Sequence, residues 1–165
     1  MAVKKKFPYR AAVVACNGGC RAKKDPECEY GCIGCKKCVE SCKFGAIMIN
    51  EIGVAEVDED KCIACGRCVR ECPQKIIHLH ECANYIVVKC SNKKKGKEAG
   101  AVCSVSCIGC GLCEKTCTAG AVKVLDNCAV IEESICLSCG MCAVKCPRHV
   151  IVDQRGILTE KYKKD

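Results

Sequence analysis

Short apolar runs bounded by turn residues follow one another along this chain, and this pattern is typical of short strands. We expect strands at residues 11–15, 46–50, 54–57, 76–80, 85–89, 121–125, 128–131 and 150–153. Short helical turns are expected to begin within residues 39–42, 69–72, 114–117 and 143–146. Residues 92–100 are rich in Lys and Gly and read as a loop. Since no segment sustains an apolar period of 3.6 residues, the pattern predicts a fold of small mixed elements.

The composition limits how such a fold can be held together. Cysteine makes up 23 of the 165 residues, about 14%, well past the share at which cysteine itself defines a class of protein. Without cysteine the hydrophobic content falls from 50% to about 36%, below the usual share for a globular core. The chain also has four Tyr, two Phe and no Trp. Crosslinks or bound metal must therefore add stability that apolar burial does not supply.

The cysteines fit either a disulfide framework or a metal-binding protein. Disulfide-rich proteins are secreted and need an export signal. The basic segment at residues 1–9 is followed by an apolar run only at residues 11–16, which is too short for export or for a membrane span. An odd number of cysteines also cannot pair completely. We therefore expect a cytoplasmic chain without a transmembrane segment, whose reduced thiols bind metal.

Four runs share the pattern Cys-x2-Cys-x2-Cys-x3-Cys and contain sixteen of the cysteines. The runs come in twos, and the segments beside them repeat as well, since residues 13–16 match 87–90 and residues 28–35 match 103–110. The chain thus reads as two copies of one unit of about 75 residues. We place the first unit at residues 10–84, the second unit at residues 85–153 and a charged tail at residues 154–165.

Three cysteines at this spacing wrap a tight loop around one face of a [4Fe–4S] cube, so the fourth ligand must come from elsewhere. In the bacterial run that ends in Cys-Pro, the fourth cysteine ligates the other cluster of a two-cluster ferredoxin. This rule predicts four [4Fe–4S] clusters and an α+β fold class, as two tandem bacterial-type two-cluster ferredoxin folds. The predicted ligands are set 1 (Cys32, Cys35, Cys38 and Cys72), set 2 (Cys62, Cys65, Cys68 and Cys42), set 3 (Cys107, Cys110, Cys113 and Cys146) and set 4 (Cys136, Cys139, Cys142 and Cys117). Zinc is the alternative, but each run would leave a surplus ligand around a tetrahedral ion.

The residues between the ligands fit buried clusters. An aliphatic residue that can exclude water follows the first cysteine of every run, namely Ile33, Ile63, Ile108 and Leu137. Glycine follows the second cysteine in three runs, at Gly66, Gly111 and Gly140. A loop that hugs a cube needs this conformational freedom.

Seven cysteines lie outside the runs, and their role stays open between buried inert thiols, extra iron ligands and a redox disulfide. They are Cys16, Cys20, Cys28, Cys82, Cys90, Cys103 and Cys128. Cys16 and Cys28 match Cys90 and Cys103 across the repeat. The three histidines, His78, His80 and His149, are expected on the surface or in packing, because histidine ligation of clusters needs a different arrangement.

The net charge of +8 resembles that of a nucleic-acid-binding protein, but it assumes neutral cysteines. Four clusters with their thiolates would contribute about −8, so the loaded chain would be near neutral. Two basic loops recur at equivalent places, with Lys93, Lys94, Lys95 and Lys97 in the second unit and Arg21, Lys23 and Lys24 in the first. Such loops are solvated or steer an acidic electron-transfer partner.

Residues 12–19 and 28–35, with residues 87–96 and 103–110, resemble the B subunit of the Rnf electron-transport complexes. The likeness extends over residues 10–153. It implies a ferredoxin part that relays electrons between a ferredoxin or flavoprotein and a larger redox enzyme. It also implies a place in a hetero-oligomer with NAD(P)-linked or other oxidoreductase subunits, at the periphery of a membrane complex.

The leading hypothesis is therefore an electron-transfer subunit with four clusters in series. We find no dinucleotide-binding glycine fingerprint, P-loop or nucleophile–base pair, so no catalytic site is expected in the chain itself. A free polyferredoxin that shuttles between enzymes is the second hypothesis. The third is a nucleic-acid-binding protein with structural clusters, but the scarcity of aromatic residues for base stacking weighs against nucleic acid as a partner.

Overall fold

The structure, a computed structural model, describes residues 9–22 and 28–159. Within the first unit, two antiparallel strand pairs carry the fold. They are β1 (Arg10–Val14) with β4 (Ile77–Glu81), and β2 (Ile47–Ile49) with β3 (Ala55–Val57). Helices α2 (Lys37–Ser41) and α3 (Arg67–Glu71) pack on each other, and α1 (Gly19–Ala22) follows β1. The chain therefore returns at β4 to pair with the strand on which the unit began.

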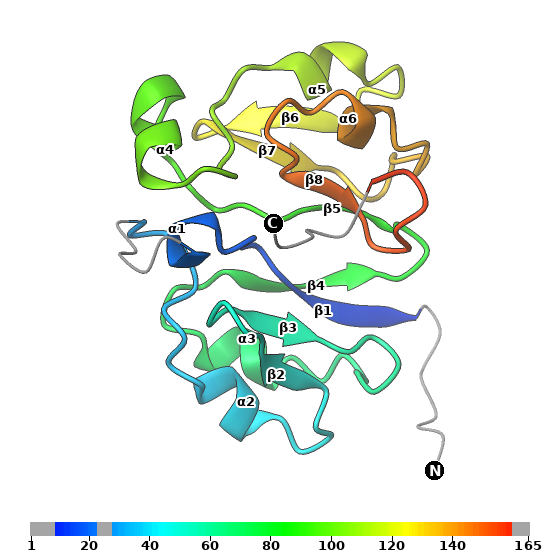
Figure 1. Cartoon of the computed structure of the whole chain (residues 1–165). Helices are drawn as coiled ribbons and strands as arrows, with labels where there is room; N and C mark the ends of the chain where they lie inside the picture. Colours follow the sequence, from blue (N-terminus) through cyan, green and yellow to red (C-terminus); the bar gives the residue numbers. More distant parts are fainter. Residues whose placement is uncertain (1–8, 23–27, 160–165) are drawn as a thin grey trace.

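The second unit repeats this topology. Its strand pairs are β5 (Ile86–Val88) with β8 (Ile151–Asp153), and β6 (Val122–Leu125) with β7 (Cys128–Ile131). Helices α5 (Leu112–Thr116) and α6 (Met141–Val144) correspond to α2 and α3, while α4 (Gly96–Val102) follows β5. Figure 1 shows the units stacked, with β1/β4 and β5/β8 near the middle, the helix pairs at the outer ends, and α1 and α4 on one side.

Each unit has its own small core between strands and cysteine loops. In the first unit, buried residues such as Val14, Ile47 and Ile77 pack with Cys38 and Cys68. In the second unit, Val122, Val150 and Ile151 pack with Cys113 and Cys142. Cysteine sulfurs thus occupy positions that large apolar side chains hold in an ordinary core.

The two units contact each other through polar groups near the segment that joins them. The backbone N–H of Glu81 donates to Glu133 Oε2 at 3.1 Å. Asn84 Nδ2 donates to the backbone oxygen of Glu133 at 3.1 Å. On the side of α1, Ser91 Oγ donates to the backbone oxygen of Tyr30 at 2.6 Å. Segments far apart in the sequence are therefore held together at both ends of the junction.

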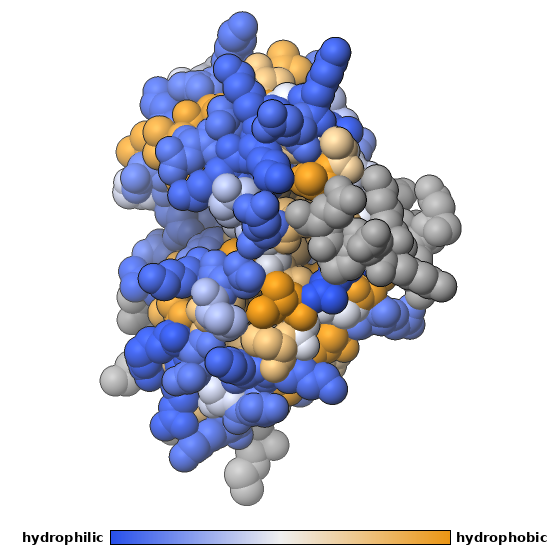
Figure 2. Space-filling model, turned by 90° about the vertical axis from the view of Figure 1, so that its left-hand side faces the viewer, coloured by the Kyte–Doolittle hydropathy of each residue, from blue (hydrophilic) through white to orange (hydrophobic). Residues whose placement is uncertain are grey.

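The surface that Figure 2 shows is largely hydrophilic, with apolar patches scattered among the polar side chains. Such a surface agrees with the high share of charged residues, which is 28% of the chain. The apolar side chains that matter for the sites lie around the cysteine loops.

The expected mixture of short strands and short helices is confirmed. All eight predicted strands form within one residue of their predicted limits, and the four motif helices begin two residues earlier than expected. The loop prediction for residues 92–100 is wrong in its second half, because α4 begins at Gly96 and buries Ala99 completely. Helix α1 was not predicted. In residues 9–22 and 28–159, no helix has the length and apolar character that crossing a bilayer would require.

The expected tail is partly described. Residues 154–159 are mostly exposed, but they turn back toward β8, since Asp153 accepts the backbone N–H groups of Arg155, Ile157 and Leu158 at 2.9–3.2 Å. The Arg155 guanidinium also lies 3.1 Å from the ring centre of Tyr85. The rest of the predicted tail and most of the basic segment at residues 1–9 lie outside the described residues.

Candidate metal centres

The four cysteine runs share one backbone conformation, which explains their sequence pattern. The residues on either side of the second cysteine both take a positive φ in every run. They are Gly34 and Lys36, Ala64 and Gly66, Gly109 and Gly111, and Ser138 and Gly140, with φ between 50° and 75°. Each short helix begins directly after the second residue of its pair. Two left-handed residues turn the loop around the second cysteine, and glycine takes most of these positions because it has no Cβ to clash.

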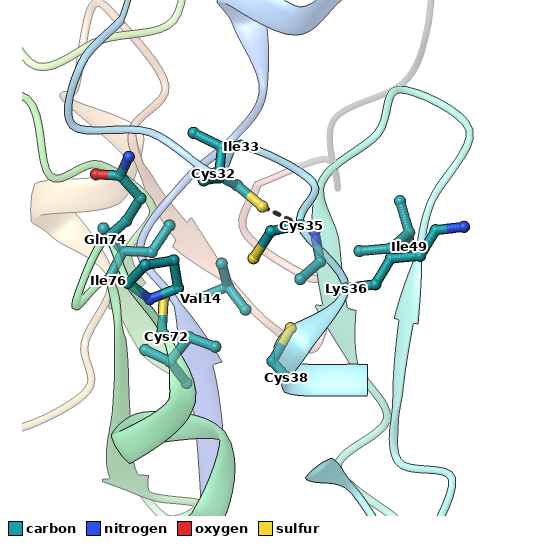
Figure 3. Close-up of a pocket in the computed structure, with 13 residues that line it drawn as sticks. Val14, Cys32, Ile33, Cys35, Lys36, Cys38, Ile49, Cys72, Gln74 and Ile76 are labelled. Atoms are coloured by element: carbon teal, nitrogen blue, oxygen red, sulfur yellow. Dashed lines mark hydrogen bonds between the residues drawn. The ribbon is translucent and has the colours of Figure 1, made fainter. Parts of the chain in front are cut away.

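Set 1 comes together around one cavity in the first unit. A cavity of about 350 Å³ is lined by Cys32, Cys35 and Cys38 from one loop and by Cys72 from the end of the other run. Figure 3 shows Cys72 across from Cys32, Cys35 and Cys38. Val14, Ile49 and Ile76 are among the apolar side chains that also line the cavity. The fourth cysteine therefore crosses from the second run to the loop of the first.

Sets 2 and 3 are arranged in the same way. Cys42 joins the loop of Cys62, Cys65 and Cys68 around a cavity of about 330 Å³. Cys146 joins the loop of Cys107, Cys110 and Cys113 around a cavity of about 320 Å³. These side chains come from different runs of the sequence, and each cavity is otherwise lined largely by apolar side chains, as a desolvated inorganic cluster requires.

Three thiols of set 4 lie close together in the second unit. The thiols of Cys136 and Cys117 lie near Cys142, and burial together with these neighbours raises the pKa of Cys142 to about 11. Cys139 is exposed on the loop beside them. Cys113 of set 3 also acts on Cys142, so sets 3 and 4 are neighbours within the second unit.

The third cysteine of each run is buried, and burial is the main reason that its proton is held tightly. Burial raises the pKa of Cys68 to about 11, and the thiols of Cys62, Cys65 and Cys42 raise it further. The pKa of Cys113 reaches about 11 for the same reason, and the pKa of Cys38 is raised as well. A metal that binds these sulfurs must displace their protons, so binding releases protons and depends on pH.

Backbone N–H groups point at several of the sulfurs. Ala12 donates to Cys62 Sγ at 3.4 Å and Ala55 donates to Cys32 Sγ at 3.5 Å. Ala129, which corresponds to Ala55, donates to Cys107 and helps to lower its pKa, although the thiol of Cys128 contributes most of the shift to about 6. Hydrogen bonds to the sulfurs that ligate a cluster tune its reduction potential, so these donors on β1, β3 and β7 would tune clusters bound at sets 1 to 3.

Sets 1 to 3 each place four cysteine sulfurs around one cavity. In residues 9–22 and 28–159, no three His, Cys, Asp or Glu side chains converge closely enough to hold one metal ion. The cysteines of sets 1 to 3 stand around cavities, which suits a cube whose irons sit at separate corners. His78 and His149 are exposed and His80 is buried, so the histidines lie on the surface or in packing, as expected.

The aliphatic residues after the first cysteines are less protective than predicted. Ile33 is 46% exposed and Leu137 is 74% exposed, so neither seals its loop from water. Ile63 and Ile108 are half-buried. Two of the four side chains therefore turn outward, which the sequence pattern does not reveal.

The basic loop of the second unit is partly engaged within the chain. Lys93 Nζ pairs with Asp126 at 3.2 Å, and Lys94 Nζ pairs with Glu29 of the first unit at 3.7 Å. In the first unit, Arg21 Nε donates to the backbone oxygen of Cys32 at 3.0 Å and so holds the loop of set 1. Lys23 and Lys24 lie outside the described residues.

Comparisons with known proteins find iron–sulfur domains in this chain. The model of the 4Fe-4S dicluster domain matches residues 31–76 and 61–121, and that of a 4Fe-4S binding domain matches residues 133–154. A solved chain from the formate dehydrogenase–heterodisulfide reductase–formylmethanofuran dehydrogenase complex of Methanospirillum hungatei aligns with 78% of this chain and 53% of its own length. At 19% identity and a TM-score of 0.29, it supports no inference.

Three curated relatives are B subunits of ion-translocating complexes. The B subunit of the ion-translocating oxidoreductase complex of Methanosarcina acetivorans is 41% identical over 75% of this chain and 47% of its own length. The B subunit of the proton-translocating ferredoxin:NAD(+) oxidoreductase complex of Clostridium ljungdahlii is 41% identical over 75% of this chain and 44% of its own length. The B subunit of the Na(+)-translocating ferredoxin:NAD(+) oxidoreductase complex of Acetobacterium woodii is 42% identical over 86% of this chain and 41% of its own length. The chain thus spans less than half the length of these relatives. The resemblance expected from the sequence is confirmed, and the chain belongs to the 4Fe-4S dicluster family and is similar within it to the B subunits of Rnf-type complexes.

Proposed function

We propose that this chain is an electron-transfer protein that binds four [4Fe–4S] clusters through sets 1 to 4. The clusters lie in two ferredoxin-type units, residues 10–84 and residues 85–153. A bound cluster accepts and releases one electron. The chain supplies four thiolates for each cluster, largely apolar walls around sets 1 to 3, and N–H donors to the sulfurs of Cys62 and Cys32.

The observation that carries this proposal is the crossing of the fourth cysteines. Cys72 lies with the loop of set 1, Cys42 with the loop of set 2 and Cys146 with the loop of set 3. In a two-cluster ferredoxin the fourth cysteine of each run likewise ligates the cluster of the other run, which ties the two sites together. A structural zinc site would use local ligand pairs and would gain nothing from the crossing.

Electron exchange with a partner is supported by the exposure of one ligand in every set. The second cysteine of each run, Cys35, Cys65, Cys110 and Cys139, is exposed, although its neighbours in the run are half-buried or buried. Each site therefore approaches the surface at one corner. Apolar side chains gather around set 4, where Ile135, Leu137, Met141 and Val144 are 46–74% exposed. An apolar rim around an exposed ligand favours docking of a redox protein at set 4.

The partners follow from the relatives. Their names describe subunits of ion-translocating complexes, two of them ferredoxin:NAD(+) oxidoreductases. We infer that this chain serves as an electron-transfer subunit of a larger oxidoreductase and exchanges electrons with ferredoxin or flavoprotein partners. A free polyferredoxin would carry the same sites but would purify alone.

The test is anaerobic purification with metal analysis. At four irons per cube, the four sets require at least about sixteen irons and sixteen sulfides per chain. Reduction should give the EPR signals of coupled [4Fe–4S] clusters, and redox subunits should co-purify. Zinc in place of iron, or about half the iron, would overturn the electron-transfer assignment.

A further inference from the structure

A fourth cavity lies at the junction of the two units and contains no cysteine of the four runs. We call it the junction pocket, and it is lined by Cys16, Cys20, Cys28, Cys90 and Cys103. Its volume is about 270 Å³. Five of the seven cysteines outside the runs therefore surround one cavity, which is smaller than the cavities of sets 1 to 3.

The sulfurs in this pocket lie near one another across the junction. A Cβ placed on Gly31 would lie 3.5 Å from Cys16 Sγ and 3.6 Å from Cys28 Sγ, so both sulfurs flank the same small space. The thiols of Cys20, Cys103 and Cys90 all act on Cys28, whose pKa is raised mainly by burial. Because Cys28 belongs to the first unit and Cys103 to the second, the pocket is assembled by the contact between units.

The repeat gives the pocket an internal symmetry. Cys16 corresponds to Cys90 and Cys28 corresponds to Cys103, so each unit contributes the same two positions. The backbone N–H of Cys32 donates to Cys16 Sγ at 3.4 Å, and the backbone N–H of Cys107 donates to Cys90 Sγ at 3.2 Å. Two equivalent pairs of thiols facing one cavity provide the four ligands that an iron–sulfur cluster needs.

The wall of the junction pocket also holds a donor without a partner. Asn92 lines the pocket and is 1% exposed. Its Oδ1 accepts the backbone N–H of Lys94 at 2.9 Å, whereas its Nδ2 finds no acceptor among the described residues. A buried N–H group without a partner costs free energy. The sulfide or thiolate of a bound cluster would accept from it.

From these features we propose that the junction pocket binds a fifth iron–sulfur cluster, a [4Fe–4S] cube ligated by Cys16, Cys28, Cys90 and Cys103. Cys20 has no counterpart in the second unit and is the spare thiol. The hydrogen bonds from Cys32 and Cys107 place the pocket directly beside sets 1 and 3. The fifth cluster would therefore join the electron path of the first unit to that of the second, one electron at a time.

The inference rests on the proposed function only for the iron–sulfur loading of the chain, and the two can fail separately. Native mass spectrometry of the anaerobic full-length protein, with iron analysis, should find five cubes and about twenty irons. The Cys28→Ser/Cys103→Ser variant removes one ligand from each unit and should hold four cubes and about sixteen irons. Cys20→Ser, in the same pocket, should keep all five.

The outcomes separate the hypotheses. A wild-type chain with four cubes overturns the fifth site and leaves the proposed function standing, and this result does not depend on how any variant folds. Fewer than four cubes in the wild type overturn the proposed function. Loss of a cube from Cys20→Ser, or five cubes retained by Cys28→Ser/Cys103→Ser, overturns the ligand assignment of the junction pocket.

Discussion

Replacement of Cys72 by alanine tests the crossing of ligands on which the proposed function depends. In sequence, Cys72 ends the run of Cys62, Cys65 and Cys68, but in space it lines the cavity of Cys32, Cys35 and Cys38. The substitution should therefore damage the cluster of set 1 and spare that of set 2. The fourth iron of set 1 would lose its thiolate, so the site should either convert to a three-iron form or empty.

The magnitude follows from the ligand count. Conversion to a three-iron form removes about one iron per chain and emptying removes about four, because each cube holds four irons. Double variants show which site is affected. If Cys35 and Cys72 serve one cluster, Cys35→Ser/Cys72→Ala should lose no more than that one cube. Cys65→Ser/Cys72→Ala should lose up to two, since its substitutions fall on different clusters.

Iron and sulfide analysis and EPR of the reduced and oxidised variants measure these losses. Cys42→Ala is the reciprocal variant and should damage set 2, whereas Cys82→Ala, outside every run, should leave the cluster count unchanged. If Cys65→Ser/Cys72→Ala loses only one cube while Cys35→Ser/Cys72→Ala loses two, ligation is local to each run. The exchange of fourth cysteines between the runs would then be refuted, together with the main support for the electron-transfer proposal.

Three further predictions concern the chain around the clusters. Gly66→Ala should lower the free energy of unfolding by about 1–2 kcal/mol, because Gly66 has a left-handed φ of 72°, while a Cβ there would meet no atom closer than 3.8 Å and so adds no clash. Lys36→Gly, at the equivalent position with φ 63°, should raise it by up to about 1 kcal/mol, because relief of about 1–2 kcal/mol of backbone strain outweighs the entropy that glycine adds to the unfolded chain, about 0.4–1 kcal/mol. A gain from the first variant or a loss from the second in denaturant titrations would contradict the reasoning. Burial opposes ionisation of Asp153, but the N–H groups of Leu158 and Arg155 outweigh it and hold the pKa of Asp153 below its ordinary value. The ionised carboxylate should therefore stabilise the fold by about 2 kcal/mol relative to Asp153→Asn, fully above the unfolded pKa near 4 and no longer once the pH falls through the lower folded pKa. A stability difference between the two proteins that grows on acidification would contradict this pH dependence. Stripping iron with a chelator and an oxidant should abolish the cooperative unfolding transition in circular dichroism, because metal binding supplies folding free energy in both small cores; an iron-free chain with unchanged secondary structure would disprove this.

The strands could be predicted from the sequence because each is a short apolar run between turn residues. Residues 128–131 form a strand with the predicted limits, and β1 shifts by only one residue. Helix α4 was missed because its glycines and lysines resemble a loop, whereas the burial of Ala99 depends on its packing in the second unit. Helix α1 has four residues and no periodicity to recognise. Local sequence patterns predict the strands, whose apolar runs are visible in the sequence. They fail for a helix whose formation depends on contact with another segment.

The cysteine loops show a similar division. Glycine after the second cysteine indicates a left-handed residue at Gly66, Gly111 and Gly140, and all three have a positive φ. Lys36, Ala64 and Ser138 take the same conformation without glycine. A non-glycine residue in this region costs about 1–2 kcal/mol, which the cluster ligands that it positions must offset. The repeat of the loop, rather than the residue type at one position, carries the signal for these strained sites.

The junction pocket depends on information that no single unit contains. The repeat identifies Cys16 with Cys90 and Cys28 with Cys103, but identity across a repeat is equally compatible with four inert thiols, since buried cysteine is common. What changes the interpretation is that contacts between the units bring the two pairs to one cavity. The hydrogen bond from Ser91 to the backbone of Tyr30 and the ion pair of Lys94 with Glu29 both join the segments that carry them. Each unit alone would present only two of the four proposed ligands and part of the cavity, so a cluster bound there would hold the units together as well as connect their electron paths.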